Sequence, residues 1–207
     1  MFNMNIKNFD KSTLLSDKTI DTLFLKANLR KLNLSCKILN CDFVSDSFNY
    51  FPIFNKFETV KYLFDWQAGN SLDHFYSKKF YNYLNEHYNK FPIIKDAYIL
   101  GSSPGDNYYS NLIHFLPRIF FNDQEEIRLA VHRNLSNKFR KLITNIAKKL
   151  KKKMTFVYLD NDFYLFKNSQ IPQFLKVWKA VKILNYFLNN ISNKKNNLKI
   201  YVVGKIA

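Results

Sequence analysis

The sequence is poor in the residues that usually mark linkers and cross-links. It contains four Gly, five Pro and two Cys among 207 residues. So few Gly and Pro exclude a long flexible or proline-rich linker. Cys36 and Cys41 have no second Cys or Cys/His pair nearby, so their spacing falls short of a zinc-site pattern. We therefore expect two reduced thiols and no metal.

Long uninterrupted apolar runs are also missing. The opening MFNMNIKNFDKST lacks the continuous apolar core of a secretory signal. Charged residues interrupt the longest apolar runs well before the ~18 residues that a membrane-spanning helix needs. We expect a cytoplasmic protein, and peripheral contact with the inner face of the membrane stays open.

Acidic side chains are scarce, because 16 Asp and Glu stand against 32 Lys and Arg and leave a net charge of +16. A basic balance is typical of proteins that bind nucleic acid or anionic membranes. Only five of the basic residues are Arg, and the abundance of Lys, Asn, Ile, Phe and Tyr is what an AT-rich genome favours. We favour genome composition as the cause of the positive charge. Nucleic acid is a less favoured partner, because proteins that bind it more often use Arg. The run KKLKKK at residues 148–153 leaves weak contact with anionic lipid as an alternative.

Apolar residues are plentiful at 47%, which is enough for a folded core. From residue 96 onward, short β-rich runs alternate with segments of helical period. Apolar stripes over residues 135–150 and 174–191 predict two helices, the first capped by Asn134 or Ser136. Strands are predicted for AYIL (97–100), IRLAV (127–131), MTFVYL (154–159) and KIYVV (199–203). The fold class that follows is α/β, with a Rossmann-like parallel sheet flanked by helices and built from βαβ units.

Residues 1–90 are harder to interpret. Short apolar runs such as KILNCDFV suggest strands followed by a helix, and residues 71–87 have the period of an amphipathic helix. We therefore expect an N-terminal β/α annex over residues 1–90 and a Rossmann-like domain over residues 91–207.

The segment after the 97–100 strand carries the most chemistry. It reads GSSPGDNYYSNLIHFLPRIFF over residues 101–121. It lies at the carboxyl end of a predicted strand, and parallel sheets bind their ligands at this edge. The two Gly do not have the G-x-G-x-x-G spacing, so a phosphate cradle is the weaker alternative. His114 and Arg118 lie four residues apart and would share a helix face. Pro117 predicts a kink or a restart of that helix.

Two further polar groups follow predicted strands. His132, Arg133 and Asn134 come at the end of IRLAV, where they could meet a sugar or phosphate oxygen; helix capping and surface packing are the alternative. Asp160 and Asp162 have the D-x-D spacing of metal-bridged nucleotide sites. We favour a simple turn for this pair.

The tract NYYSNLIHFLPR, residues 107–118, resembles the signature of glycosyltransferase family 61. In that signature an Asn-Tyr-Tyr-His opening leads through a hydrophobic stretch to Leu-Pro-Arg. The segments EEIRLAVHRNLSNKFRKLI and FVYLDNDFYLFKNSQIPQF are similar to the parts of the family that follow, so the resemblance spans about residues 95–203. Two positions depart from the signature, since Ser110 stands where a His is common and His114 where an acidic residue is common. The matching positions are Asn107, Tyr108, Tyr109, Leu116, Pro117 and Arg118.

The resemblance implies a GT-B architecture and transfer of a sugar from a nucleotide donor to a glycan or protein acceptor; we expect a role in cell-surface or capsular polysaccharide synthesis. It implies no metal and no cofactor, apart from a nucleotide sugar as donor substrate where a donor domain is present. The implied partners are a glycan acceptor and a separate donor domain or transferase subunit. No catalytic residue is assigned. The expected substrate-binding residues, from the signature and the strand ends together, are Asn107, Tyr108, His114, Arg118, His132, Arg133 and Asn134.

The length of the chain gives one more expectation. KIYVVGKIA resembles the strand at which the family passes into its donor-binding domain, and 207 residues do not accommodate two full domains. We therefore expect the N-terminal, acceptor-side portion of a transferase, truncated or split. The alternatives are a non-catalytic basic module for nucleic acid or anionic membranes, and a partner subunit of a complete transferase.

This expectation predicts that the purified chain neither hydrolyses nor transfers sugar from any nucleotide sugar, because no donor-binding domain holds the nucleotide diphosphate. Release of nucleoside diphosphate from a panel of nucleotide sugars is the measurement. Turnover by the chain alone would contradict the expectation.

Overall fold

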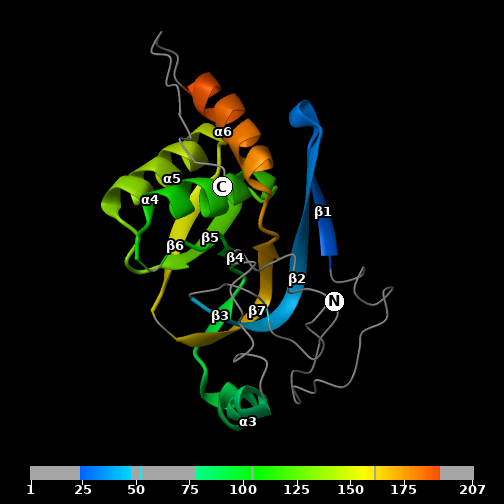
Figure 1. Ribbon diagram of the computed structural model, residues 1–207, viewed down its shortest axis with the longest axis vertical. Coiled ribbons are helices and arrows are strands. Elements are labelled where there is room, and N and C mark those ends of the chain that lie inside the picture. Colours follow the sequence, from blue (N-terminus) through cyan, green and yellow to red (C-terminus); the bar gives the residue numbers. More distant parts are fainter. Residues whose placement is uncertain (1–23, 48–51, 53–77, 104, 161, 192–207) are drawn as a thin grey trace, which may run out of the picture.

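The computed structural model describes residues 24–47, 52, 78–103, 105–160 and 162–191. Within these residues a seven-stranded sheet is flanked by helices (Figure 1), with strand order β1-β2-β7-β4-β5-β6 and β3 beside β7. The chain is therefore a mixed α/β protein. No helix among the described residues is long and apolar enough to cross a membrane. In chain order, the elements are β1 (Phe24–Leu29), η1 (Arg30–Leu32), β2 (Leu34–Asp46), α3 (Lys78–His87), η3 (Tyr88–Lys90), β3 (Ile93–Lys95), β4 (Tyr98–Ile99), α4 (Tyr108–Ser110), η4 (Asn111–Phe115), η5 (Leu116–Phe121), β5 (Glu126–His132), α5 (Asn137–Lys149), β6 (Lys153–Leu159), β7 (Phe163–Pro172) and α6 (Val177–Ile191).

Five strands form the parallel part of the sheet, since β7 pairs in parallel with both β3 and β4. β4 pairs with β5 through Tyr98 and Leu129, and β5 pairs with β6 along its whole length. Helical segments connect β4 to β5 and β5 to β6, so two βαβ units are present. Three of the predicted strands are thereby confirmed. The fourth, KIYVV at residues 199–203, lies outside the described residues.

The sheet is mixed, which corrects the expectation of a parallel sheet. β2 runs antiparallel to both β1 and β7. β7 was missed in the sequence because polar residues interrupt its apolar pattern. One of them, Ser169, is fully buried but satisfied, since its hydroxyl accepts from Ala97 N (3.1 Å) and donates to Lys167 O (2.8 Å). A buried polar group that finds such partners is compatible with a central strand.

The N-terminal strands also correct the expected division into an annex and a domain. β1 and β2 lie within residues 1–90, yet β2 pairs with β7 over most of its length. Residues 24–47 therefore belong to the same sheet as the rest of the described chain. The predicted helix over residues 71–87 is confirmed as α3 where the structure describes it; residues 71–77 and most of the proposed annex lie outside the described residues.

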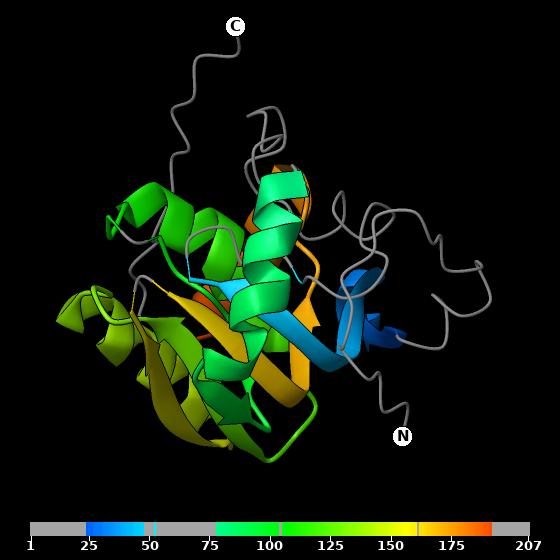
Figure 2. The same cartoon turned by 90° about the horizontal axis from the view of Figure 1, so that it is seen from below.

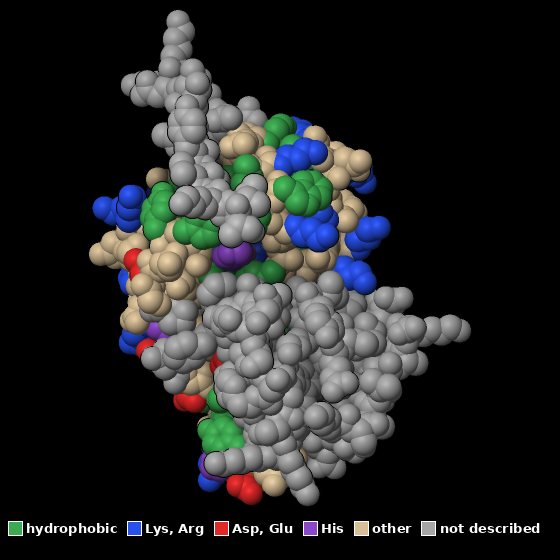
Figure 3. Space-filling model, in the orientation of Figure 1, with side chains coloured by type: hydrophobic (Ala, Val, Ile, Leu, Met, Phe, Trp, Pro, Cys, Tyr) green, Lys and Arg blue, Asp and Glu red, His purple; other side chains and the backbone are tan. Residues whose placement is uncertain are grey.

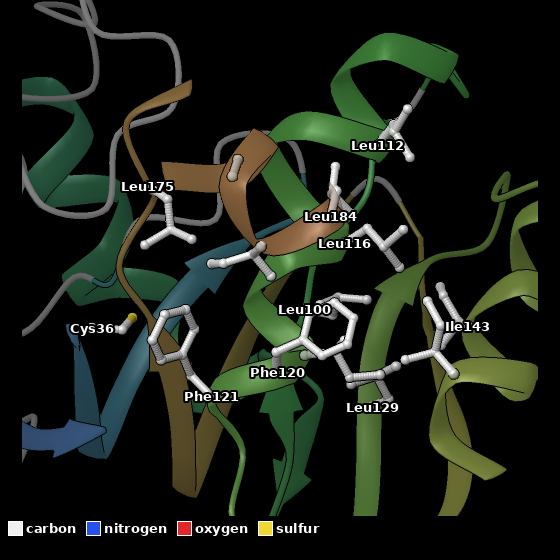
Figure 4. Packing of buried hydrophobic residues seen from close by; sticks show 14 of the residues in the cluster. Cys36, Leu100, Leu112, Leu116, Phe120, Phe121, Leu129, Ile143, Leu175 and Leu184 are labelled. Atoms are coloured by element: carbon white, nitrogen blue, oxygen red, sulfur yellow. The ribbon is translucent and has the colours of Figure 1, made fainter. Parts of the chain in front are cut away.

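One face of the sheet packs against helices. Successive strand residues point to opposite faces, so Tyr98 and Leu100 join one core while Ala97 and Ile99 join the other. The helix-covered core combines strand side chains with those of η4, η5, α5 and α6 (Figure 4). Cys36 lies in this core, and burial raises the pKa of its thiol to about 12. Both cysteines are free, as expected, and both are buried.

The other face is covered mainly by the sheet itself. β7 bends sharply partway along its length (Figure 2), which brings its first residues close to the end of β6. Three residues, 160–162, therefore suffice to connect the two strands. Ser47, at the end of β2, donates a hydrogen bond from its hydroxyl to the carbonyl of Asp160. The enclosed core includes Phe43 and Phe166, whose rings stack with centroids 5.3 Å apart, and Leu84 of α3.

The bend of β7 involves its neighbours on both sides, which are β2 and the segment between β3 and β4. Asp96 lies between β3 and β4 with φ of 52°, and Asn168 of β7 has φ of 47°, so both occupy the left-handed region that Asn and Asp tolerate best. β2 shifts register between Cys41 and Phe43, around Asp42. Asp42 Oδ1 accepts from Asn168 N (2.8 Å), and Asn168 Nδ2 donates to Asp96 Oδ1. Local conformation and side-chain hydrogen bonds therefore fix the corner of the sheet together.

Replacing Asn168 tests this corner. Asn168→Ala removes the bond to Asp96 and places a Cβ residue without a polar group at positive φ. Asn168→Gly removes the same bond but accepts that backbone conformation. We expect both variants to be less stable than the wild type in urea unfolding, and the Ala variant to be about 1 kcal/mol less stable than the Gly variant. An Ala variant at least as stable as the Gly variant would show that the corner does not depend on the left-handed conformation.

Candidate functional site

The loops that follow β4 and β5 are bonded to each other at the carboxyl edge of the sheet. Gly101, at φ of 77°, donates its N–H to Ala130 O (3.0 Å), and His132 N donates to Ser102 Oγ (2.8 Å). Farther along the first loop, Asp106 Oδ1 accepts from Ser136 N (3.1 Å) at the start of α5. The two loops therefore form one surface, at the place where the sequence predicted a ligand.

A buried amide organises the first loop. Asn111 is 2% exposed; its Oδ1 accepts from Ser103 N (2.7 Å) and its Nδ2 donates to Asp106 Oδ1 (2.9 Å). Asp106 adopts φ of 49° and donates its own N–H to Ser103 O (2.9 Å), which closes a tight turn. Sequence reasoning assigned no role to Ser102, Ser103, Asp106 or Asn111. The signal that could have found them is the concentration of small polar residues in GSSPGD directly after a buried strand.

The family-like tract begins with two exposed aromatic rings. Asn107 caps α4, because its Oδ1 accepts from Ser110 N (3.0 Å). Tyr108 is 52% exposed, with the Lys138 Nζ 4.9 Å from its ring centroid and the Phe139 ring 5.1 Å away. Tyr109 is 47% exposed, and its ring makes a T-shaped contact with that of His114, with the ring centroids 5.9 Å apart. The short helix α4 thus presents two phenol rings, and that of Tyr108 lies beside the first turn of α5.

The tract continues as a helix of changing pitch, as Pro117 predicted. α4 passes into the π-helical turn η4 and then into the 3₁₀ helix η5, which has Pro117 in its first turn. A proline cannot donate to the preceding turn, so the change in hydrogen-bond pattern at this position has a direct cause. His114 is half-buried in η4, and burial lowers its pKa below the ordinary value of 6.5. Burial therefore favours the neutral form of this imidazole.

Arg118 occupies a position that the sequence interpretation did not foresee. Its side chain is fully buried, with NH1 donating to Leu100 O (2.8 Å) and NH2 donating to Pro172 O. The guanidinium also lies 4.1 Å from the ring centroid of Phe174. Since Leu100 follows β4 and Pro172 ends β7, Arg118 holds the helical tract against both strand ends. In this conformation it positions the tract, and the expectation of direct contact between Arg118 and a substrate is corrected.

The loop after β5 brings the other expected residues to the same edge. His132 is 2% exposed, and its Nδ1 accepts from Asn134 N (3.1 Å), which leaves the ring proton on Nε2. Arg133 is exposed and forms a two-point ion pair with Asp160, with Nε to Oδ1 at 2.6 Å and NH2 to Oδ2 at 3.0 Å. Ser136 caps α5 by accepting from Phe139 N (3.4 Å), as predicted. Asn134 is exposed beside them.

The structure therefore separates the expected residues into two groups. Asn107, Tyr108, Arg133 and Asn134 are exposed and can meet a ligand directly. His114 is half-buried, whereas Arg118 and His132 are buried beneath the surface. Asp160 serves as the ion-pair partner of Arg133. In the part of the chain that is described, no three His, Cys, Asp or Glu side chains gather as a metal site.

Two arginines of this edge differ in their predicted energetic roles. Arg118→Ala leaves the carbonyls of Leu100 and Pro172 buried without donors, and we expect a loss of about 3 kcal/mol or more in the free energy of unfolding. Arg133→Ala breaks an ion pair whose side chains are 64% and 58% exposed, and should cost less than about 1 kcal/mol. Urea unfolding of both variants measures the difference. Equal losses would show that Arg118 does not hold the strand ends.

Comparison of the chain with protein-family models, with curated proteins and with solved structures gave no match. The function proposed below therefore rests on the resemblance in the sequence and on the geometry of the carboxyl edge.

Proposed function

We propose that this chain is the acceptor-side, glycan-binding portion of a family 61-like glycosyltransferase in cell-surface or capsular polysaccharide synthesis. The proposal includes a GT-B architecture, of which the two βαβ units would be part. The observation that carries it is the position of the tract 107–118, which forms a loop and helices at the carboxyl edge, bonded through Asp106 and Ser136 to the loop that holds Arg133 and Asn134.

The chemistry of the exposed side chains suits a sugar. Tyr108 and Tyr109 offer apolar ring faces with a polar tip, the kind of side chain that can cover the C–H face of a sugar and also hydrogen-bond to it. Asn134 and Arg133 offer amide and guanidinium groups that match hydroxyl oxygens. Such a combination of aromatic surface and a few convergent polar groups is typical of small-molecule sites.

The buried groups would hold this surface rigid. Asn111 and Asp106 fix the loop before Tyr108, and Arg118 fixes the helix after it. A rigid surface lowers the entropy that is lost when an acceptor binds. The donor nucleotide would be held by a separate donor domain or transferase subunit, and we assign no catalytic residue.

Binding of glycans to the purified chain tests the proposal. Saturation-transfer NMR with a panel of oligosaccharides that contain hexoses, N-acetylhexosamines and uronic acids should identify a ligand. We expect Tyr108→Ala to weaken its affinity about three- to tenfold through loss of ring contact. Asn134→Ala should weaken it in the same direction through loss of hydrogen bonds.

Tyr83→Ala is the matched control, because Tyr83 is a similarly exposed tyrosine on α3, far from α4 in Figure 1. Its affinity should equal that of the wild type. The proposal fails if no oligosaccharide of the panel binds the folded chain. It also fails if Tyr83→Ala lowers the affinity as much as Tyr108→Ala does.

A further inference from the structure

A second surface lies away from the carboxyl-edge loops, at the start of α6 and the turn η1 between β1 and β2. The two elements touch, since Lys182 Nζ donates to Leu32 O (3.0 Å). Trp178 and Lys182 are four residues apart and share one face of α6. We name this region the basic α6 surface, and its residues are Arg30, Lys31, Lys176, Val177, Trp178, Lys179 and Lys182.

All charged side chains of the basic α6 surface are Lys or Arg. Residues 24–41 and residues 163–191 contain no Asp or Glu, although they contain eight Lys and Arg. In Figure 3, the described side chains over the start of α6 and the tip of the β1–β2 hairpin show a hydrophobic group bordered by Lys and Arg, with no acidic side chain beside it. Among the described residues of this region, no acidic group therefore neutralises the positive potential.

Helix stability does not explain the charge pattern. Lys176 and Lys179 lie at the N-terminal end of α6, whose first turn holds no acidic residue. The helix dipole disfavours cations at this end and favours anions. Two lysines beside the first N–H groups of the helix therefore cost stability and add to a potential that attracts an anion.

The same surface exposes an aromatic side chain. Trp178 is 57% exposed and Val177 is 40% exposed, while the next turn of α6 is buried through Ala180, Ile183 and Leu184. The Lys179 Nζ lies 5.6 Å from the centroid of the Trp178 ring. Trp is enriched at membrane–water interfaces, where its apolar body and its N–H both find suitable surroundings. Lysines around it would meet anionic headgroups.

We propose that the basic α6 surface docks peripherally on a membrane that carries anionic phospholipid, with Trp178 and Val177 entering the interface and the lysines meeting the headgroup phosphates and carboxylates. Two observations favour a bilayer over nucleic acid. The exposed apolar side chains of Trp178 and Val177 would gain no favourable contact from a phosphate backbone alone. The cations, apart from Arg30, are Lys, which lacks the planar fork that reads phosphates and bases in two-point contacts. The proposal does not depend on the glycan-binding function.

Vesicle co-sedimentation of the full chain tests the docking. Wild-type protein should bind vesicles of phosphatidylcholine that contain about a third phosphatidylserine, should bind pure phosphatidylcholine much more weakly, and should be released as NaCl is raised. Reversing two charges in Lys176→Glu/Lys179→Glu should lower the partition coefficient at least about tenfold, since each lysine contributes to the attraction. Trp178→Ala should lower it severalfold at constant net charge.

The matched control is Lys90→Glu/Lys95→Glu, which makes the same change of net charge at two exposed positions in η3 and β3, away from α6 in Figure 1. It should retain most of the binding, and circular dichroism should show that all variants are folded. The proposal is overturned if both double variants lose binding equally, if Trp178→Ala binds like the wild type, or if no binding to anionic vesicles occurs. It is also overturned if a single-stranded oligonucleotide binds more tightly than the vesicles and the two substitutions at 176 and 179 abolish that binding while Trp178→Ala leaves it unchanged.

Discussion

The buried guanidinium of Arg118 is the interaction on which the rest of the carboxyl edge depends. It joins three parts of the chain, because it extends from η5 and donates to the carbonyl of Leu100 after β4 and to that of Pro172 at the end of β7. The Tyr98 hydroxyl of β4 in turn donates to the carbonyl of Arg118 (2.7 Å). Burial of a charge is costly unless its donors are satisfied, so this arrangement favours one position of the helical tract.

That position determines what the surface displays. With η5 fixed against β4 and β7, the preceding turn places Asn111 beneath the loop, where it bonds to Ser103 and Asp106. The loop in turn meets the start of α5 at Ser136, so Tyr108 at the start of α4 and Asn134 before α5 lie on adjoining segments. Buried polar contacts thus arrange the exposed surface for which we propose glycan binding, while the basic α6 surface is built from other elements and carries different chemistry.

Local patterns were sufficient to predict part of this structure. The apolar runs around β4, β5 and β6, the period of α5 and the cap at Ser136 are all properties of short segments, and all were confirmed. The position of His132, Arg133 and Asn134 at the carboxyl edge follows from the same logic, because parallel strands end together. The break in the helical tract was predictable from Pro117 alone.

The remaining features depend on contacts between distant segments. β7 contains Asn168 and Ser169, which break its apolar pattern; their side chains hydrogen-bond to Asp96 and to the backbone of Lys167 and Ala97. The burial of Arg118 likewise depends on carbonyls 18 and 54 residues away, so its sequence position on a polar-looking helix face suggested a ligand contact instead. Hydrogen–deuterium exchange of wild type and Arg118→Lys tests the central claim most directly, since Lys cannot reach both carbonyls with a planar fork. The account predicts faster exchange in residues 108–121 and unchanged protection in α5; unchanged exchange in residues 108–121, or an equal increase across the whole sheet and α5, would contradict it.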